Sequence, residues 1–229
     1  MKKYLLKDNF LTKCFGNNVY KLKNKLINHN ILKKLKSPFF IYFKTQKKNK
    51  LLLKIGFKFI DQLITFRGKT KKTLITNTVS FRLAKKYDLK KIQLISKKNM
   101  KLDRFYFDKE INDKIAKKIK IKWLDNYFKK KRGTHLFICL KKNIIIGFCL
   151  IIFEMKKKQV IIDLISIDKR FQSKGIGQQM FSYIKQYFQN ENLIFMVGSY
   201  KKNIKAINFY SKIGLKKLKT ENIYHYQKR

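Results

Sequence analysis

From Val79 onward, the hydrophobic pattern of the chain alternates between strand-like and helix-like segments. The expected strands are Val79–Leu83, Leu136–Leu140, Ile144–Phe153, Val160–Ile167 and Leu193–Val197, and the expected helices are Leu89–Ser96, Ile111–Phe128, Phe181–Phe188 and Ala206–Ile213. A final strand follows the last helix. Strands that alternate with helices in this way indicate an α/β or α+β sandwich and not a helical bundle.

Local signals support several of these elements. Apolar side chains recur every fourth residue from Ile115 to Tyr127, which is the stripe of an amphipathic helix. Lys141–Asn143 separates two apolar runs and predicts a hairpin turn. Asp88 directly precedes a helical pattern and is expected to cap that helix with its side chain.

The first 66 residues alternate short apolar runs with Lys and Asn. Phe39–Phe43 and Phe57–Phe66 are expected to be strands, and Lys50–Ile55 a helical turn that ends at Gly56. Arg67–Thr78 is polar and lacks periodicity, which is typical of a linker. The sequence therefore predicts a small α/β subdomain over 1–66, a linker over 67–78 and a larger domain over 79–229.

The charge of the chain raises the hypothesis of a basic nucleic-acid-binding protein. Lys and Arg number 57 against 13 Asp and Glu, and the formal net charge is +44. However, nearly all the basic residues are Lys, they are spread along the whole length, and Ile, Asn, Phe and Tyr are also abundant, which is the profile of an AT-rich genome. We therefore expect weak, salt-sensitive adhesion to polyanions and no specific nucleic-acid partner.

The three cysteines, Cys14, Cys139 and Cys149, have neither CxxC spacing nor nearby His residues, so no metal site is expected. The longest apolar run, Ile144–Phe153, is too short to span a membrane. The basic start of the chain has no apolar segment behind it, so no signal peptide is expected. These features predict a soluble, cytoplasmic protein.

A loop with two glycines follows the strand that ends at Ile167. The chain runs from Asp168 to Gly177 directly into a helix, with Gly175 and Gly177 near the helix start. Glycines there allow a tight turn and let backbone amides approach a ligand, and the positive end of the helix favours a diphosphate. A plain strand-to-helix turn is the alternative.

A second segment runs from Asn203 through Ala206 to Tyr210, followed by Gly214-Leu215. Together with Gln172-x-x-Gly-x-Gly177, this segment resembles motifs A and B of the GNAT acetyltransferases. In that family, Gln/Arg-x-x-Gly-x-Gly/Ala and Asn-x-x-Ala-x-x-x-Tyr…Gly-Phe/Leu clasp acetyl-coenzyme A. Asn203 and Tyr210 are seven residues apart, so they are expected to share one face of a helix. The resemblance implies the GNAT fold, an α+β fold with a splayed mixed sheet and flanking helices.

The resemblance also implies roles for individual residues. Backbone groups of the strand pair with the pantetheine arm, amides of the glycine loop hold the pyrophosphate, and Asn203 hydrogen-bonds the cofactor near its pantetheine. Gly175 and Gly177 keep the cofactor's space free of a Cβ atom. The implied cofactor-binding residues are Ile165, Ser166, Ile167, Gln172, Ser173, Lys174, Gly175, Ile176, Gly177, Gln178 and Asn203.

Tyr210 is implied to protonate the departing thiolate. A phenol with a reference pKa of about 10 can donate to a thiolate whose conjugate acid lies near 8.5. The alternative is a core aromatic residue beside Phe209. The general base stays open, because the strand at Leu193–Val197 is followed by Gly198-Ser199 and no carboxylate. Asp163 and a relayed water are both candidates for that base, and Asp163 is equally an outward-facing strand residue.

Looser similarities extend along most of the chain to the dTDP-4-amino-4,6-dideoxygalactose (fucosamine) acetyltransferases. They lie at Cys14-Phe15-Gly16, Gly56–Phe66, Asp103-Arg104-Phe105, Trp123–Asn126 with Arg132-Gly133, and Ile223–Tyr226. The departures are Asp103, where that family has Ser, and the missing Asp-rich entry segment. This resemblance implies a nucleotide-linked amino sugar as acceptor.

Arg104 is the candidate substrate-binding residue, because a guanidinium can pair with the diphosphate of a nucleotide sugar. The alternative is a surface arginine. The leading hypothesis is therefore acetyl transfer from acetyl-CoA to the 4-amino group of a dTDP- or UDP-linked deoxy sugar for surface polysaccharide. A GNAT enzyme that acetylates a protein N-terminus or a small amine is the rival enzyme, and a homodimer is compatible with either.

Overall fold

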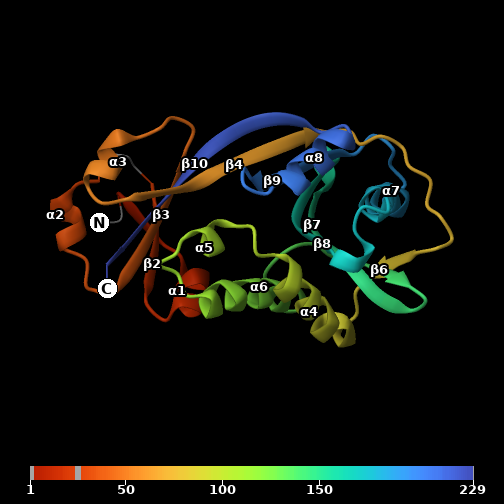
Figure 1. Ribbon diagram of the computed structural model, residues 1–229, viewed down its shortest axis with the longest axis horizontal. Coiled ribbons are helices and arrows are strands. Elements are labelled where there is room, and N and C mark those ends of the chain that lie inside the picture. The colour runs from red at the N-terminus through yellow and green to blue at the C-terminus, as the bar shows by residue number, and fades with distance from the viewer. Residues whose placement is uncertain (1–2, 24–26, 229) are drawn as a thin grey trace.

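The computed structural model describes residues 3–23 and 27–228, and its ten strands there form one mixed sheet (Figure 1). The order across the sheet is β1-β2-β3-β10-β4-β9-β8-β7-β6-β5. Only the neighbours β2–β3 and β8–β9 are parallel within these residues. The strands are β1 (Leu5–Lys7), β2 (Asn18–Leu22), β3 (Phe39–Thr45), β4 (Lys58–Gly68), β5 (Ser80–Leu83), β6 (His135–Lys141), β7 (Ile144–Glu154), β8 (Gln159–Ile167), β9 (Ile194–Tyr200) and β10 (Lys216–Lys228).

Helices cover both faces of the sheet. The α-helices are α1 (Asn9–Phe15), α2 (His29–Lys33), α3 (Lys50–Lys54), α4 (Leu89–Asn99), α5 (Arg104–Phe107), α6 (Asp113–Phe128), α7 (Ile176–Tyr187) and α8 (Ile204–Lys212). Apolar residues of α7 and α8 share a core with one face of β6–β9, whereas α4 and α6 pack on the opposite face. The molecule is therefore α+β, as the hydrophobic pattern predicts.

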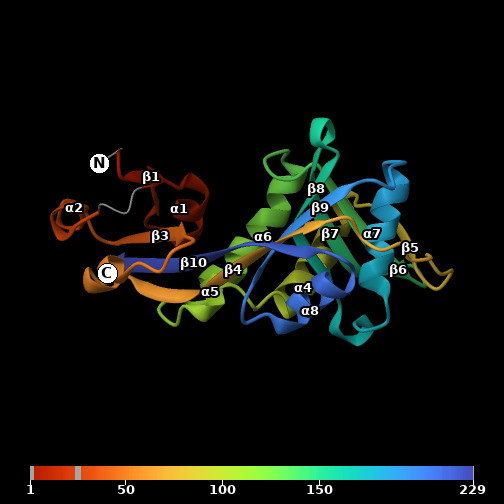
Figure 2. The same cartoon turned by 90° about the horizontal axis from the view of Figure 1, so that it is seen from above.

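Two long strands join the amino-terminal part of the molecule to the rest. β4 and β10 lie side by side and run from the end near both termini to the region of α8 (Figures 1 and 2). β10 pairs with β3 through Asn222–Lys228 and with β4 through Lys216–His225. β4 pairs in turn with β9, so the sheet passes through the predicted subdomain and the predicted larger domain without a break.

The segment between β4 and β5 is bonded along its length to α7 and to the end of α8. Lys71 N donates to Ile213 O at 2.9 Å, and Lys185 Nζ donates to Thr70 O at the same distance. Thr76 N donates to Gln179 Oε1 at 3.0 Å. The division of the chain at residues 66 and 79 stays a prediction, and these bonds attach the intervening segment to the larger part.

Most of the expected strands and helices from Val79 onward are confirmed, including the hairpin, where Lys142 and Asn143 have φ of 47° and 61° as a tight primed turn requires. The predicted capping by Asp88 is wrong. Asp88 precedes α4, but its carboxylate receives both Arg82 guanidinium nitrogens at 2.7 and 3.0 Å. α7 also begins at Ile176, earlier than the pattern predicts. The hydrophobic pattern did not indicate the first turn of this helix because that turn is largely polar.

The hydrophobic pattern did not predict several short elements near the amino terminus. β1, α1, β2 and α2 have three to seven residues each, which is too few for a clear period. Over residues 3–23 and 27–228, no helix combines the length and the apolar character needed to cross a bilayer. In the same ranges, His, Cys, Asp and Glu nowhere form a group of three that could hold a metal ion.

Candidate active site

Strands β8 and β9 pair along only part of their length and then separate. The parallel register runs from Gln159–Ile194 to Ile162–Val197. Beyond that point, β8 remains paired with β7 up to Ile167, while the end of β9 remains paired with β4. The stretch from Asp163 to Ile167 therefore has a strand neighbour on one side only, and its other edge can pair with an extended ligand.

The opening begins at a β-bulge. Leu150 is opposite Leu164, whereas Ile151 is opposite Ile162, so Asp163 is the extra residue of β8. The Asp163 carboxylate receives Arg132 Nε at 2.5 Å and Arg132 Nη2 at 2.6 Å. The bulge thus fixes an ion pair at the point where the two strands separate.

Backbone groups of β8 face the opening in alternation. Asp168 N donates to Ile146 O at 2.7 Å and so faces β7. Because alternate residues of a strand direct their polar groups to opposite sides, Ile165 and Ile167 face away from β7. Ile167 O accordingly accepts Gln172 Nε2 at 2.7 Å and Asn99 Nδ2 at 3.2 Å. Gln172 therefore closes the glycine loop against the strand through its side chain.

The glycine loop leads into the N-terminus of α7. Ser173 has φ of 61° and Gly175 has φ of 73°, and Gly175 is the residue before the first helical turn. A Cβ at Gly175 would meet only Gln178 Oε1, at 3.9 Å. The first N–H groups of the helix lack intrahelical partners, so the loop offers amides next to open space, as a phosphate requires.

Gly177 serves the packing of two helices and not the cofactor space that the resemblance implies. A Cβ there would lie 2.9 Å from the Phe209 ring. The expectation that Gly177 keeps space for a ligand is therefore wrong. Its missing side chain lets α7 and α8 pack closely, because the Phe209 ring occupies the space in which a Cβ would stand.

Tyr210 lies in the core between the sheet and α8. Its side chain is 4% exposed, and its ring lies 5.8 Å from Phe66 and 5.4 Å from Phe209, centre to centre. Burial raises the pKa of Tyr210 far above its ordinary value, and the charge that Cys149 carries as a thiolate would raise it further. The phenol is thus protonated at neutral pH and is a hydrogen-bond donor in an apolar surrounding.

Asn203 is the residue that begins α8. Its Oδ1 accepts the backbone N–H of Ala206 at 3.4 Å, which makes it the N-cap of the helix, and its carbonyl accepts the N–H of Ile207 at 3.1 Å. The expectation that Asn203 and Tyr210 share one face of this helix stays a prediction.

Arg104 is the first residue of α5. The side chain is buried, with 8% of the residue exposed, and its guanidinium carbon lies 4.1 Å from the centre of the Tyr42 ring. Within residues 3–23 and 27–228, Arg104 Nη1 has no hydrogen-bond partner. The alternative of an exposed surface arginine is therefore wrong.

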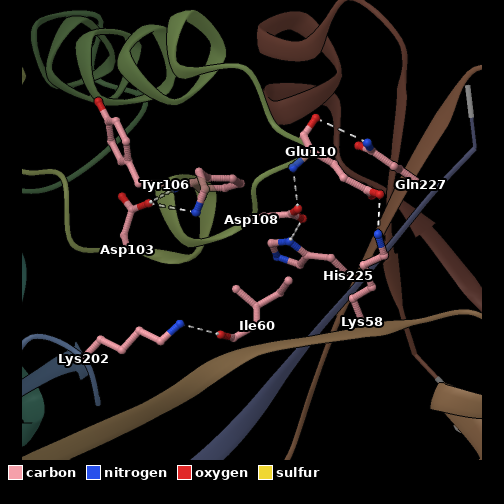
Figure 3. A network of polar contacts seen from close by, with 10 residues as sticks. Lys58, Ile60, Asp103, Tyr106, Asp108, Glu110, Lys202, His225 and Gln227 are labelled. Carbon is pink, nitrogen blue, oxygen red and sulfur yellow. Dashed lines mark hydrogen bonds and ion pairs between the residues drawn. The ribbon is translucent and has the colours of Figure 1, made fainter.

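Buried carboxylates hold α5 at both ends. Asp103 caps the helix, accepting a backbone N–H at 2.8 Å, and pairs with Lys120. Asp108 follows the helix and lies 2.7 Å from Nδ1 of His225 (Figure 3). Burial lowers the pKa of His225 to about 4, so the imidazole is neutral and Nδ1–H donates to Asp108. These contacts fix the position of Arg104.

Arg104 opens onto a hollow of about 360 Å³ between α1, β3, α6 and the loop after α6. The lining residues are Asp8, Phe10, Leu11, Tyr42, Arg104, Trp123, Asn126, Lys131 and Arg132. A second hollow, of about 500 Å³, shares Lys131 and Arg132 with the first and extends to Asp163. The two hollows connect the neighbourhood of Arg104 with the bulge at the strand opening.

Arg104, Trp123, Asn126 and Arg132 of these hollows lie in segments that the resemblance singled out, whereas Phe10 and Tyr42 carried no functional signal. Phe10 and Tyr42 belong to short elements whose position next to α6 depends on the whole sheet. The rarity of arginine was a second signal for Arg132. In a chain rich in Lys, an Arg at a partly buried position indicates a need for the planar, bidentate guanidinium.

Comparisons with known proteins agree with this architecture. The sequence matches the acetyltransferase (GNAT) family over residues 98–215. None of the curated proteins matches it significantly. A functionally unknown conserved protein from Staphylococcus epidermidis ATCC 12228 has a similar fold, with a TM-score of 0.69, 14% identity, and coverage of 99% of this chain and 92% of that one.

Two solved GCN5-related N-acetyltransferases share the fold at lower similarity. The enzyme from Kribbella flavida has a TM-score of 0.53 and 8% identity and covers 82% of this chain and 68% of its own. The enzyme from Sphaerobacter thermophilus has a TM-score of 0.54 and 6% identity, with coverage of 97% and 75%.

These matches favour the enzymatic hypothesis over a nucleic-acid-binding protein. The family match spans the bulge, the glycine loop and Tyr210, and the strand opening supplies the free backbone edge that an extended co-substrate needs. The chain belongs to the GNAT family of acetyl-CoA-dependent N-acetyltransferases.

Proposed function

We propose that this enzyme acetylates the primary amine of a nucleotide-linked deoxy amino sugar. The acceptor is inferred chiefly from Arg104, a buried guanidinium whose Nη1 has no partner among the described residues. A buried donor without a partner costs about 1–3 kcal/mol, so a site that retains one is suited to an anionic ligand. The diphosphate of a nucleotide sugar has that chemistry.

The cofactor end is assigned to the strand opening. Backbone groups of Ile165 and Ile167, which face away from β7, bind the pantetheine arm as an added strand, whereas those of Ser166 between them face β7. Amides from Ser173 to Gln178 hold the pyrophosphate, and the open space at Gly175 supports that placement. Lys174 adds positive charge beside the loop, and Asn203 contacts the pantetheine from the start of α8.

Tyr210 is assigned as the general acid. The neutral acceptor amine attacks the thioester carbonyl, and its nitrogen then gives up a proton to solvent. As the carbon–sulfur bond breaks, the phenol donates its proton to the departing thiolate, and solvent then reprotonates the phenolate. Burial keeps Tyr210 protonated at neutral pH, which a proton donor requires. Within the apolar core, the phenol also stabilises the developing negative charge on sulfur more strongly than water would.

Cationic acceptors fit this chain poorly. The protein carries 57 basic residues against 13 acidic ones. The hollow beside Arg104 contains three cationic side chains and the single carboxylate of Asp8, which already caps α1 and accepts the Tyr42 hydroxyl at 2.9 Å. A polyamine would be repelled by this charge, whereas a nucleotide sugar would be attracted.

The acceptor can be tested directly by mass spectrometry. The enzyme and acetyl-CoA would be incubated with dTDP- and UDP-linked 4-amino sugars, with the same free amino sugars, and with a peptide amine and spermidine. We expect a mass gain of one acetyl group on a nucleotide-linked sugar, and none without enzyme. Preferential acetylation of the peptide or of spermidine would overturn the proposed acceptor.

A further inference from the structure

We infer that Arg104 and Arg132 together form an anion subsite for the diphosphate of the acceptor, and that Asp163 positions Arg132 instead of serving as the general base. This inference rests on the proposed function and adds a second cation to the acceptor site. It also assigns a task to the ion pair at the β8 bulge.

Arg132 stands where the two hollows meet. It lines the one of about 360 Å³ that contains Arg104 and the one of about 500 Å³ that reaches Asp163. An anion between the two arginines would therefore lie beside α1 and α6, while the rest of the ligand extends toward the strand opening. In this arrangement the diphosphate binds between the arginines and the amine reaches the strand opening, as a nucleotide-linked amino sugar requires.

The orientation of Arg132 is fixed by two neighbours. Asp163 engages Nε and Nη2, and the guanidinium carbon lies 4.4 Å from the centre of the Trp123 ring. This side-on pairing leaves Nη1 outside the ion pair. A guanidinium held by a carboxylate at one edge and an aromatic face below is preorganised to donate to a second anion.

Arg104 supplies the complementary cation on the opposite wall. Its guanidinium lies against the Tyr42 ring, and its Nη1 is the buried donor without a partner among residues 3–23 and 27–228. Burial, followed by the charge of Arg104, lowers the pKa of nearby Lys44 to about 8.

Asp163 is poorly arranged to accept a proton from the attacking amine. Each carboxylate oxygen receives a hydrogen bond from the same guanidinium, at 2.5 and 2.6 Å. Protonation would break a part-buried, bidentate ion pair, which is a costly step during catalysis. The bulge instead uses Asp163 to hold Arg132 at the entrance of the opening.

Binding experiments on the full chain test the anion subsite without catalysis. Isothermal titration calorimetry would measure the affinity of the protein for inorganic pyrophosphate, thymidine diphosphate and thymidine, all at the same salt concentration. We expect thymidine diphosphate and pyrophosphate to bind and thymidine alone not to bind. Arg104→Gln and Arg132→Gln should each weaken the binding of thymidine diphosphate about tenfold or more, which is the loss typical of a charged hydrogen bond.

A matched control removes an arginine elsewhere. Arg67 is exposed on β4, on the part of the sheet away from the hollow, so Arg67→Gln changes the net charge equally. Thymidine diphosphate affinity should be unchanged in Arg67→Gln, and acetyl-CoA affinity should be unchanged in all three variants. Equal weakening in Arg67→Gln would show that only the general positive charge attracts the nucleotide, and would overturn the subsite.

Asp163→Asn separates positioning from base catalysis. If Asp163 positions Arg132, the acceptor KM should rise about tenfold while kcat at saturation and its pH profile stay near those of the parent. A collapse of kcat with an unchanged KM would make Asp163 the base and overturn the positioning role. Nucleotide sugars that are acetylated with normal KM in Arg132→Gln would overturn the subsite while the proposed function survives.

Discussion

The proposed cofactor end and the proposed acceptor hollow of this enzyme are built in different ways. The cofactor end comes from one continuous run, β8-α7-β9-α8, and relies on backbone edges, a glycine conformation and an apolar core around Tyr210. The acceptor hollow draws on α1, β3, α5, α6 and the loop after α6, and relies on side chains, four of which are charged and one of which, Arg104, is buried.

The difference follows from what each ligand part requires. Pantetheine and pyrophosphate can be bound by main-chain groups that any GNAT sequence supplies if its glycines and strand ends are in place. An acceptor is recognised by particular side chains, whose positions depend on how separate segments pack. Around α5 this demands a network in which Asp103 pairs with Lys120 and Asp108 with His225, because an unpaired carboxylate would be costly there.

Removing the first 78 residues should have the largest effect. A Val79–Arg229 fragment lacks β4, which pairs with both β9 and β10, and loses Phe66 beside Tyr210. We expect poor solubility and no cooperative transition in calorimetry. A Lys58–Arg229 fragment, which retains β4, is the matched control and should be better folded. A fully active Val79–Arg229 fragment would show that the cofactor end is independent of the front of the chain.

Tyr210→Phe tests the cofactor end at its chemical step. The ring and its packing remain while the proton donor is lost, so kcat should fall by about 10²-fold or more, as for a positioned general acid. Acetyl-CoA affinity, measured by titration, should change little. Near-normal kcat with chemistry rate-limiting would leave Tyr210 as a core aromatic residue and thiolate departure to solvent.

The two loop glycines should respond differently to substitution. Gly177→Ala forces a Cβ against the Phe209 ring and should destabilise the unliganded protein by about 1–3 kcal/mol, as overpacking does. Gly175→Ala strains a residue at φ of 73° and should cost about 1–2 kcal/mol.

Thermal shifts with acetyl-CoA separate packing from binding at these glycines. The ligand-induced rise in Tm should persist in Gly177→Ala and shrink in Gly175→Ala, whose new Cβ points into open space at the loop. The reverse pattern would contradict the assignment of the open space at Gly175 to the pyrophosphate.

The last effect develops only as the pH falls, and it concerns the buried histidine next to α5. The pKa of His225 is about 4 in the folded protein and about 6.5 unfolded, so the unfolded chain binds the extra proton first as pH falls. Stability from this group should be fully present above pH 6.5 and lost between about 6.5 and 4, by on the order of 3 kcal/mol. His225→Gln, followed by urea denaturation from pH 7 to 4, should flatten that decline. If the free energy of unfolding falls equally in His225→Gln, the loss of stability at low pH comes from the carboxylates and not from His225.

Local sequence determined the parts of this protein whose contacts are close along the chain. Strands and helices after Val79, the hairpin at Lys142-Asn143 and the glycine loop before α7 could all be predicted, because periodicity and turn chemistry are local. The motif residues from Gln172 to Tyr210 indicated the family for the same reason. Asp88 shows the limit even for nearby residues, since its carboxylate accepts bonds from Arg82 and from Lys85 N and not from the first N–H groups of α4.

Tertiary structure alone decided where the acceptor side chains meet. Tyr42, Arg104 and Arg132 are far apart in sequence, and no spacing rule relates them. They share a hollow because β10 pairs with both β3 and β4, which places the short front elements against α6. The packing role of Gly177 could not be predicted from the sequence either. The ring that lies against the position of a Cβ there belongs to Phe209, on another helix. Packing between distant segments has no local signature, so only the folded chain could show it.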